Sequence, residues 1–506
     1  MTSIKNESKK IDESLFVMNS KRVALFILTY NAEKHIKKTL SRIPKEIVDK
    51  FTSIYLIDDS SPDKTFQESI DCAKSLGLKN FIAMQTPFNQ GYGGNQKIGY
   101  TYAIEHEFDI VIMLHGDGQY PPEFLPDMIA GFKNDETAAV FGSRMIHRYQ
   151  ALKGGMPLYK WFGNQVLTTF ENKLLGSKLF EFHSGYRAYS IPAIKSIPYL
   201  RNSNNFHFDT DIIIQLIAKN LKIKEVAMPT YYGDEECHVD GLKYAFNCIK
   251  SVIKFRLHKM GIFYQPNFDI EQSDIRNYDL KSHKNTLHHF VQHTHWKESD
   301  IVADIGANDG RLSSSIAEKV KEIIAVDIKK PNFTKENVTP MEMDLNENFD
   351  SILGSQKFDK VLALDIIEHL NNPEEAVQKI NNILKNNGIL YASTANIAYI
   401  IMRMTLIIGW FNYGKRGILD KTHHRLFTVN SFKRLLKNNG FKINKVVGFG
   451  PPIADQISTK GIFGILDSIA SKLARMRPSL FSFNYLIVAT KKMNFSETYN
   501  ITTNKK

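Results

Sequence analysis

Residues 302–310 read VADIGANDG, and this stretch decides how the second half of the chain folds. An apolar run of strand type ends in a loop with Asp304, Gly306 and Gly310, and a helical pattern follows. Glycines at such a turn let the backbone approach a ligand closely, and ligands of open α/β sheets bind beyond the carboxyl ends of the strands. A second strand-like run ends in Asp327, about 20 residues after Gly306, where a carboxylate can accept hydrogen bonds from a ribose diol.

The elements that follow extend this predicted site. Asp344 comes after a third strand-like run, where it can address an adenine amino group. Residues 358–370, FDKVLALDIIEHL, form a fourth run that ends at Asp365, Glu368 and His369. The stretch LKNNGILYAST then supplies a turn and a fifth strand, so a second series of alternating strands and helices is expected.

A dinucleotide-binding enzyme is the obvious alternative, but it requires the pattern G-x-G-x-x-G, and Asn308 stands where the second glycine belongs. The succession of motifs resembles the class I S-adenosylmethionine-dependent methyltransferases over residues 280–492. The resemblance implies a seven-stranded Rossmann-like sheet with an antiparallel strand near residues 483–491. It implies cofactor contacts at Asp304, Gly306, Gly310, Asp327, Asp344 and Asp365. The alternative is a relative of the fold that has lost its cofactor.

The acceptor side is carried by residues 417–428, GILDKTHHRLFT, which predict a loop before an amphipathic helix. A histidine with a pKa near neutrality could remove the proton of a sugar hydroxyl as the methyl group arrives, and His423 is the candidate catalytic base. The alternative is that His369 and His423 only cap helices or hold the loop. The resemblance implies an oxygen atom of a glycan as the methyl acceptor.

The first half carries its own alternation of strand-like and amphipathic stretches. Such alternation predicts a mostly parallel sheet with helices on both faces, and hence an α/β domain. The strand-like runs are VALFIL (23–28), SIYLID (53–58), NFIAM (80–84), DIVIML (109–114) and AAVFG (138–142).

Polar residues follow the strands of this first half. Tyr30 comes after the first run, and Asp58 and Asp59 end the second, where they can bind a base or ribose or can instead cap the next helix. After the fourth run the chain reads HGDGQYPP from His115. Carboxylates there can hold a divalent cation, which offsets the negative charge of a departing nucleoside diphosphate.

These segments resemble the family 2 glycosyltransferases over residues 22–256, and among them the branch of the dolichyl-phosphate mannosyltransferases. The resemblance implies a GT-A type nucleotide-sugar fold and an inverting transfer from a nucleoside-diphosphate sugar. The metal motif of that branch is D-x-D followed by glutamine, which implies Asp117, Gln119 and His115 as ligands of Mg²⁺ or Mn²⁺. His115 replaces the first aspartate of the motif, and histidine favours Mn²⁺ over Mg²⁺.

The same resemblance implies further contacts. Arg144 and Arg187 are expected at the nucleotide sugar, with Tyr30, Asp58 and Asp59. Asp209 or Asp211 matches an acidic position near the acceptor, and we choose Asp211 as the catalytic base. Asp117 is the other candidate catalytic residue of this half. If the acceptor is a lipid phosphate, it is already ionised, and Asp211 would only orient groups. The glycine-rich stretch 88–99, FNQGYGGNQKIG, is no P-loop because no G-K-[ST] follows it.

Composition limits the partners and the compartment. The net charge of +12 suits phosphate-bearing substrates or anionic lipid, while no basic run with interleaved aromatic residues indicates nucleic acid. The cysteines, Cys72, Cys237 and Cys248, have no metal-ligand spacing, which favours a reducing, cytoplasmic compartment. The first residues are too polar for a signal peptide, and the apolar stretch 397–411 is too short to span a membrane.

The predicted organisation is a disordered tail (1–20), a glycosyltransferase domain (21–258), a linker (259–279), a methyltransferase domain (280–493) and a second disordered tail (494–506). The leading interpretation is a bifunctional enzyme of surface polysaccharide biosynthesis, acting on a glycan or a polyprenyl-phosphate-linked acceptor. In one alternative the second half is a non-catalytic binding or scaffolding module. In another, residues 461–478 contact the inner face of a membrane, although packing of that helix on the methyltransferase core is the favoured interpretation.

Overall fold

The computed structural model divides the chain into two compact units. The first comprises residues 1–255 and 265–271, and the second comprises residues 256–264 and 272–506. The structure describes residues 2–230, 240–270, 284–332, 335–456 and 461–492. The predicted C-terminal tail, Cys237 and residues 271–279 of the predicted linker lie outside this described part.

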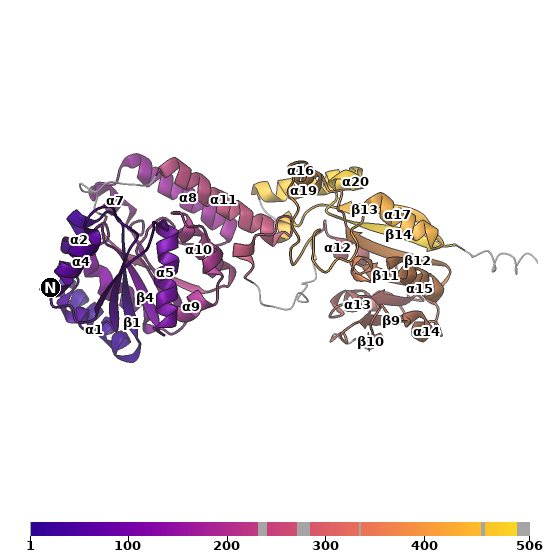
Figure 1. The fold of residues 1–506 in the computed structure, drawn as a ribbon. Helices are drawn as coiled ribbons and strands as arrows, with labels where there is room; N and C mark the ends of the chain where they lie inside the picture. The colour runs from indigo at the N-terminus through magenta and orange to yellow at the C-terminus, as the bar shows by residue number, and fades with distance from the viewer. Residues whose placement is uncertain (1, 231–239, 271–283, 333–334, 457–460, 493–506) are drawn as a thin grey trace, which may run out of the picture. The chain divides into compact units, whose positions relative to one another are not determined.

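The first unit is built on a seven-stranded mixed sheet in the order β3-β2-β1-β4-β6-β5-β7. Its strands are β1 (Val23–Thr29), β2 (Ser53–Asp58), β3 (Phe81–Gln85), β4 (Ile110–His115), β5 (Thr137–Ser143), β6 (Arg187–Ser190) and β7 (Lys222–Ala227). Strand β6 runs antiparallel to β4 and β5, and the other neighbours are parallel. The central strands are buried along their whole length because helices cover both faces of the sheet (Figure 1).

The helices of this unit are α1 (Thr2–Ser20), α2 (Glu33–Ser41), α3 (Lys45–Val48), α4 (Thr65–Ser75), α5 (Tyr92–Glu105), α6 (Leu125–Ala130), α7 (Arg148–Lys153), α8 (Leu158–Leu175), α9 (Ile191–Lys195), α10 (Phe208–Ala218) and α11 (Gly241–Lys259). Helix α1 precedes the first strand, helix α11 follows the last and ends within the second unit, and the other helices lie between strands. Leu25 and Ile27 of β1 face a core shared with α1, α2 and α6, whereas Phe26 faces α5. Gly99 of α5 leaves room for that ring, since a Cβ atom there would lie 2.3 Å from it.

The prediction of a disordered tail over residues 1–20 is wrong. These residues form α1, and Ser14, Val17 and Met18 are buried against the core of the first unit. Among its charged residues this segment carries apolar residues at helical spacing, Ile11, Leu15 and Met18. The helix gains stability when this face packs against the rest of the first unit.

The second unit is a seven-stranded sheet in the order β10-β9-β8-β11-β12-β14-β13. Its strands are β8 (Ile301–Ile305), β9 (Glu322–Asp327), β10 (Val338–Glu342), β11 (Phe358–Leu364), β12 (Leu384–Ala395), β13 (Phe441–Phe449) and β14 (Asn484–Lys491). Strand β14 is antiparallel to both β12 and β13, as expected for the stretch near 483–491, and the remaining neighbours are parallel. The two α/β domains confirm the predicted fold class.

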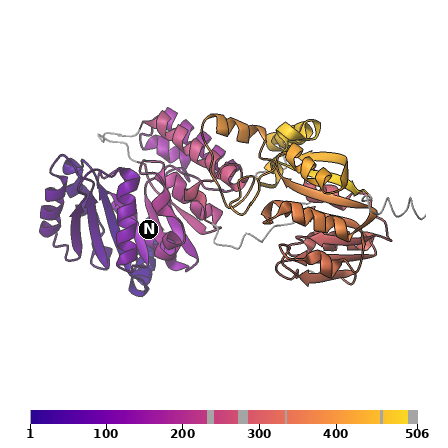
Figure 2. The same ribbon diagram turned by 45° about the vertical axis from the view of Figure 1, so that its right-hand side comes forward.

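Helices flank this second sheet as well, as Figure 2 shows from another direction. They are α12 (Leu287–Gln292), α13 (Arg311–Ile316), α14 (Phe349–Leu353), α15 (Pro373–Ile383), α16 (Ile400–Ile407), α17 (Val429–Asn438), α18 (Ile453–Gln456), α19 (Gly461–Met476) and α20 (Pro478–Phe481). Successive residues of β8 point to opposite faces, so Ala303 packs into one core cluster and Val302 into the other. Within the described residues, no helix is long and apolar enough to cross a membrane.

The described part of the predicted linker is packed. Met260 and Ile262 are buried with Tyr399 and Met402 in the second unit, while Phe268 is buried in the first. The sequence of this stretch lacks periodicity because the chain path is irregular. Its apolar side chains are nevertheless buried, since removing apolar surface from water is favourable.

Helix α1 yields a stability prediction. Val17→Asp should lower the free energy of unfolding by about 3 kcal/mol or more, because it buries an unpaired carboxylate. The neighbouring Phe16 is 62% exposed, so Phe16→Asp should change that free energy by no more than about 0.5 kcal/mol. Urea unfolding of both variants measures the difference, and equal effects would show that α1 is not docked through Val17.

Candidate functional sites

Asp209, in the first turn of α10, is the centre of a hydrogen-bond network in the first unit. The Tyr92 hydroxyl donates to its Oδ2 at 3.0 Å, and the Gln96 amide donates to its Oδ1 at 3.0 Å. Arg187 Nε lies 3.4 Å from the same Oδ2, and the guanidinium is 1% exposed. A buried carboxylate needs such compensation, so the network fixes the start of α10 beside β4 and β6.

His115, at the end of β4, joins this network. Its Nε2 lies 3.2 Å from the Tyr92 hydroxyl oxygen, and its ring meets the Tyr120 ring edge-on with centroids 4.9 Å apart. Gly185 closes the cage, because a Cβ atom there would lie 2.7 Å from the imidazole. Burial lowers the pKa of His115, so the ring is neutral near pH 7.

Asp117 and Gln119 occupy the turn just beyond β4 and are half-buried. The backbone N–H of Gln119 donates to Asp117 Oδ1 at 3.0 Å. Gly118, with a φ of 76°, allows the turn. Within the described residues, His115 and Asp117 do not belong to a preformed cluster of three histidine, cysteine or carboxylate ligands. Any cation held here would therefore depend on oxygen ligands from a substrate.

Asp58 and Asp59 are buried and hold the neighbouring loops. Asp58 accepts hydrogen bonds from Ser61 and from Gln85, and Asp59 accepts from the backbone amides of Gln90 and Gly91 at 2.8 and 2.9 Å. Burial raises the pKa of Asp59, while these hydrogen bonds lower it. Both carboxylates therefore position the loops around the site, including the glycine-rich one. Tyr30, by contrast, is 46% exposed at the end of β1.

Arg144 is held by a buried ion pair with Glu181. The Arg144 backbone amide and guanidinium both donate to this carboxylate, and Asn164 donates to it at 2.9 Å. Burial raises the pKa of Glu181, but the interactions with Arg144 lower it by more, so the pKa lies below its ordinary value. Much of the hydrogen-bonding capacity of the predicted sugar-binding arginine is therefore used inside the protein.

Asp211 lies outside the Asp209 network. Its Oδ2 accepts from the Ser203 amide at 3.2 Å, and its Oδ1 is buried with no hydrogen-bond partner of good geometry among the described residues, although the Ser251 side chain lies close by. Burial raises the pKa of Asp211 to about 6. A carboxylate that binds protons this readily has the character of a general base, although it is 2% exposed.

The second unit holds its glycine loop by carboxylates in a similar way. Asp304 is buried in β8 and accepts from the Ser313 hydroxyl at 2.6 Å, and burial raises its pKa to about 6. Asp327, at the tip of β9, accepts from the Asn308 amide at 2.9 Å. Gly306 has a φ of 80°, and a Cβ atom there would lie 2.7 Å from Ile366, so only glycine fits this turn.

Asp344 and Asp365 follow the next strands along the sheet. Asp344 is half-buried and accepts from the backbone N–H of Asn346 at 2.9 Å. Asp365, at the end of β11, has a φ of 49° and accepts from the Ser393 hydroxyl at 2.7 Å. Because β10, β9, β8 and β11 are parallel neighbours, all these predicted cofactor residues meet at one edge of the sheet.

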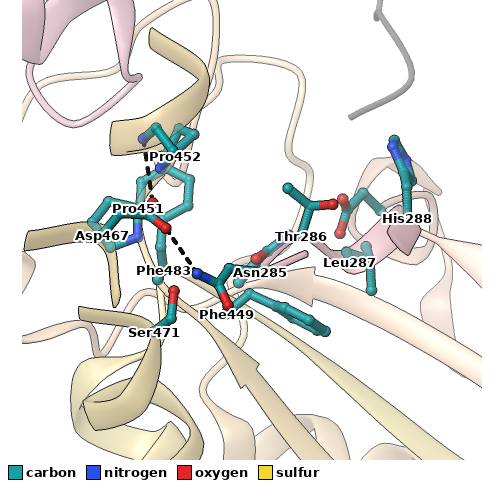
Figure 3. A pocket seen from close by; sticks show the side chains of 14 residues that line it. Asn285, Thr286, Leu287, His288, Phe449, Pro451, Pro452, Asp467, Ser471 and Phe483 are labelled. Carbon is teal, nitrogen blue, oxygen red and sulfur yellow. Dashed lines mark hydrogen bonds between the residues drawn. The ribbon is translucent and has the colours of Figure 1, made fainter. Parts of the chain in front are cut away.

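A pocket of the second unit opens beside Asp365. It is lined by Asn285, Thr286, Leu287 and His288, by the end of β13 and by α19 (Figure 3). Asp467 of α19 points into the unit, where it accepts from Asn285 at 2.9 Å and from the Ala454 amide at 3.2 Å.

The predicted acceptor loop docks onto the turn after β11. The carbonyl of Glu368 accepts from the backbone amides of His424 and Arg425 at 2.8 and 3.2 Å. The rings of His369 and His423 meet edge-on with centroids 4.7 Å apart. Arg425 itself pairs with Glu374 at the surface. The structure thus gathers His423 with two residues, Glu368 and His369, that follow β11.

Comparison with known proteins agrees with both geometries. Residues 24–197 match the family model "Glycosyl transferase family 2", and residues 279–446 match the family model "Methyltransferase domain". The chain is a family 2 glycosyltransferase joined to a methyltransferase.

Individual relatives match one half each. The first half is 29% identical over 227 residues to UDP-N-acetylglucosamine–dolichyl-phosphate N-acetylglucosaminyltransferase of Methanococcus voltae, covering 43% of this chain and 88% of the relative. It is 24% identical to undecaprenyl-phosphate mannosyltransferase of Micrococcus luteus, covering 40% and 82%. The second half is 28% identical to a mitochondrial ubiquinone biosynthesis O-methyltransferase of Dictyostelium discoideum, covering 30% of this chain and 50% of that protein.

A methyltransferase domain of this kind uses S-adenosylmethionine, and the residues present fit it. The left-handed glycines bring the backbone of the β8 loop to the sheet edge, and Asp327 stands half-buried at the adjoining strand tip. Among the described residues, the Asp327 Oδ1 atom has a single long contact, 3.4 Å from the Lys329 backbone nitrogen, which leaves it capacity for a ribose hydroxyl.

Several residues that hold the candidate site of the first unit are not predicted from the sequence. Tyr92 and Gln96 belong to a glycine-rich stretch, although a spacing of four places both on one face of α5. Glu181 and the pair of Glu171 and His183 carried no local signal, because their partners lie far away in the sequence.

His183 gives the glycosyltransferase domain a predicted pH dependence. Its Nε2 lies 3.1 Å from the buried Glu171 carboxylate, and its Nδ1 lies 3.0 Å from the Tyr244 hydroxyl oxygen. Burial lowers the pKa of His183, but Glu171 and the nearby Cys248 raise it, to about 10 from its ordinary value of 6.5. The resulting stabilisation is therefore complete below pH 6.5 and is lost as the pH rises toward 10.

Glu171→Gln removes the charge that causes this shift. The wild-type chain should exceed the variant in free energy of unfolding most strongly near pH 6, and the difference should shrink steadily up to pH 10. Denaturant unfolding at a series of pH values measures it. A difference that is independent of pH would mean that His183 is not charged in the folded protein.

Proposed function

We propose that the glycosyltransferase domain transfers a sugar from a nucleoside diphosphate to a polyprenyl phosphate, and that the methyltransferase domain methylates a sugar hydroxyl in the same surface-glycan pathway. The relatives from Methanococcus voltae and Micrococcus luteus are named for lipid-phosphate acceptors, which supports the first step. The relative from Dictyostelium discoideum is named an O-methyltransferase, which supports oxygen as the methyl acceptor.

In the glycosyl transfer, we assign the divalent cation to Asp117, with the substrate diphosphate completing its coordination. Gln119 lies in the same turn, and His115 supports that turn through Tyr92 and Asp209. The cation offsets the charge that develops on the leaving diphosphate. Tyr30 and Arg144 remain the candidates for contact with the nucleotide sugar, while Asp58, Asp59 and Arg187 shape its surroundings.

In the methyl transfer, bound S-adenosylmethionine supplies an electrophilic methyl group. We assign its ribose to Asp327 and its adenine to Asp344, with Gly306 and Gly310 shaping the loop between them. The acceptor hydroxyl enters beside Asp365. Burial lowers the pKa of His423, so its imidazole is neutral near pH 7 and is able to act as a base or as a metal ligand.

The single observation that supports the proposal is that each unit gathers predicted site residues, with Asp117 in one and Asp327 in the other, at the ends of its parallel strands. These two sites predict independent activities. Asp117→Asn should reduce nucleotide release from a nucleotide sugar by about 100-fold or more, because the cation loses its carboxylate ligand, while S-adenosylmethionine binding stays unchanged. Asp327→Ala should do the reverse and weaken cofactor binding about 10-fold or more, since a charge-assisted hydrogen bond is worth roughly 1.5–3 kcal/mol.

A screen of common nucleotide sugars with the purified chain, with calorimetry for the cofactor, measures both effects. Asp211→Asn in the same screen separates the acceptors: it should slow transfer to an ionised polyprenyl phosphate only slightly and transfer to a hydroxyl severely. Full nucleotide release by Asp117→Asn would refute the metal assignment. Absence of cofactor uptake by the wild-type chain would favour the alternative, a methyltransferase-like scaffolding module.

We further propose that α19 contacts an anionic membrane surface. The favoured interpretation of the sequence is that the apolar stripe of this helix packs on the methyltransferase core. In the structure the stripe is exposed by 37–61%, at Ile462, Ile465, Leu466, Ile469 and Leu473. The buried face instead carries Asp467, Ser471 and Ala474. Lys472, Arg475 and Arg477 lie at the end of the stripe, where they can meet lipid phosphates.

Ile465→Glu together with Ile469→Glu should abolish flotation of the chain on phosphatidylglycerol-containing liposomes, because both charges would enter the lipid boundary. Ile352, on α14 of the same unit, is 56% exposed, so Ile352→Glu serves as the matched control and should float like the wild-type chain. Failure of the wild-type chain to float removes the proposal.

A further inference from the structure

The side chains that gather around Glu368 form a cluster for which the proposed methyl transfer gives no reason. Glu368 is 1% exposed and lies in the short 3₁₀ turn Ile367–His369 after β11. Together with His369 and His423 it places one carboxylate oxygen and two imidazole nitrogens within 4.8 Å of one another. A carboxylate and two imidazoles are ligand types that transition metals prefer, so these three atoms could hold a metal ion.

The two histidines are already oriented for coordination. Nδ1 of His369 lies 3.2 Å from the Thr422 carbonyl oxygen, and Nδ1 of His423 lies 3.1 Å from the Ile418 carbonyl oxygen. A backbone carbonyl accepts only from N–H, so Nδ1 carries a proton in both rings, and Nε2 is the ring nitrogen left for coordination. This arrangement is the one that metal-bound histidines adopt.

The carboxylate lacks the partners that its burial demands. Neither oxygen of Glu368 has a hydrogen-bond partner of good geometry among the described residues, although Thr394 and the Ala395 amide lie close by. In the same part of the chain, no lysine or arginine forms an ion pair with it. Asp365 lies close enough to interact electrostatically with Glu368. A divalent cation would give the buried Glu368 oxygens the partner that the described residues do not supply.

The loop around the cluster is stiff. Asp420 is 6% exposed and accepts from the Thr422 hydroxyl at 2.8 Å and from the Thr422 amide at 2.9 Å. The Thr422 hydroxyl lies 3.1 Å from His369 Nδ1, and the loop is tied to the β11 turn through the Glu368 carbonyl. These outer contacts hold the ligand atoms in place without a cation.

We propose that Glu368, His369 and His423 bind a divalent transition-metal cation, Mn²⁺ or Zn²⁺, which holds the acceptor of the methyltransferase domain through a pair of neighbouring hydroxyl oxygens. The proposal rests on the proposed methyl transfer. The cation lowers the pKa of a bound hydroxyl, so that its proton leaves to solvent water and the oxygen is free to accept the methyl group. Open coordination positions suit oxygen ligands of a vicinal diol, and His423 is then a ligand and not the base.

Metal binding by the full chain tests this site directly. The Asp117→Asn background removes the cation assigned to the glycosyltransferase domain. After chelator treatment, calorimetry with Mn²⁺ or Zn²⁺ should show one binding event, and Co²⁺ should give the visible absorption of an imidazole-bound ion. His423→Asn should weaken binding of the cation roughly 10- to 100-fold and remove that absorption. His424→Asn is the matched control, because His424 is exposed and contributes only its backbone amide.

Glu368→Gln is the second variant, since it keeps the shape of the side chain, and it should weaken the cation to a similar extent. Equal cation binding by the wild-type, His423→Asn and Glu368→Gln chains would overturn the proposal, as would methyl transfer that is insensitive to chelator. S-adenosylmethionine binding in the same samples separates the two ideas. If the chain binds the cofactor but no cation, this inference fails alone; if it binds the cation but no cofactor, the proposed methyl transfer fails.

Discussion

Carboxylates withdrawn from water around the ends of the strands are the constraint on which both halves of this chain depend. A carboxylate removed from water costs several kcal/mol unless donors surround it. Asp209 meets this demand with Tyr92, Gln96 and Arg187, and the contacts draw α5, α10 and β6 together around the end of β4. In the methyltransferase domain, Asp304 and Asp327 fix the glycine loop to α13 and β9 by the same means.

Glu368 is the informative exception. It is as deeply buried as Asp209 and follows a strand of its own sheet, yet among the described residues no donor reaches its carboxyl oxygens with good geometry. A buried carboxyl oxygen without a hydrogen-bond donor is costly, and a bound cation is one way to offset that cost. The two histidines beside Glu368 turn their Nδ1 atoms to backbone carbonyls, and the proposed cation site lies where the three side chains converge.

Helix α19 inverts the usual relation between amphipathicity and burial. Its polar and small residues, Asp467, Ser471 and Ala474, pack inward, where Asp467 ties the helix to Asn285 and to the start of α18. Its apolar stripe remains in water. A helix held by its polar face keeps an apolar face available for a surface outside the unit, and basic residues at one end give that surface a preferred charge.

The sequence by itself determined the two α/β domains and the carboxylates that follow several strands, because alternation, glycine turns and acidic residues after strands are local patterns. The order of the strands within each sheet came from the structure, as did β6 and β7. The sequence misjudged α1, whose apolar face only gains stability against the rest of the domain, and it could not tell which face of α19 is buried. Only the tertiary structure decided which carboxylates are satisfied. It engaged Asp58, Asp59 and Arg144 with internal partners, separated Asp211 from Asp209, and brought Glu368 and His369 to His423. The physical reason is that a buried charge is compensated by whatever group the fold brings near, and those groups are distant along the chain.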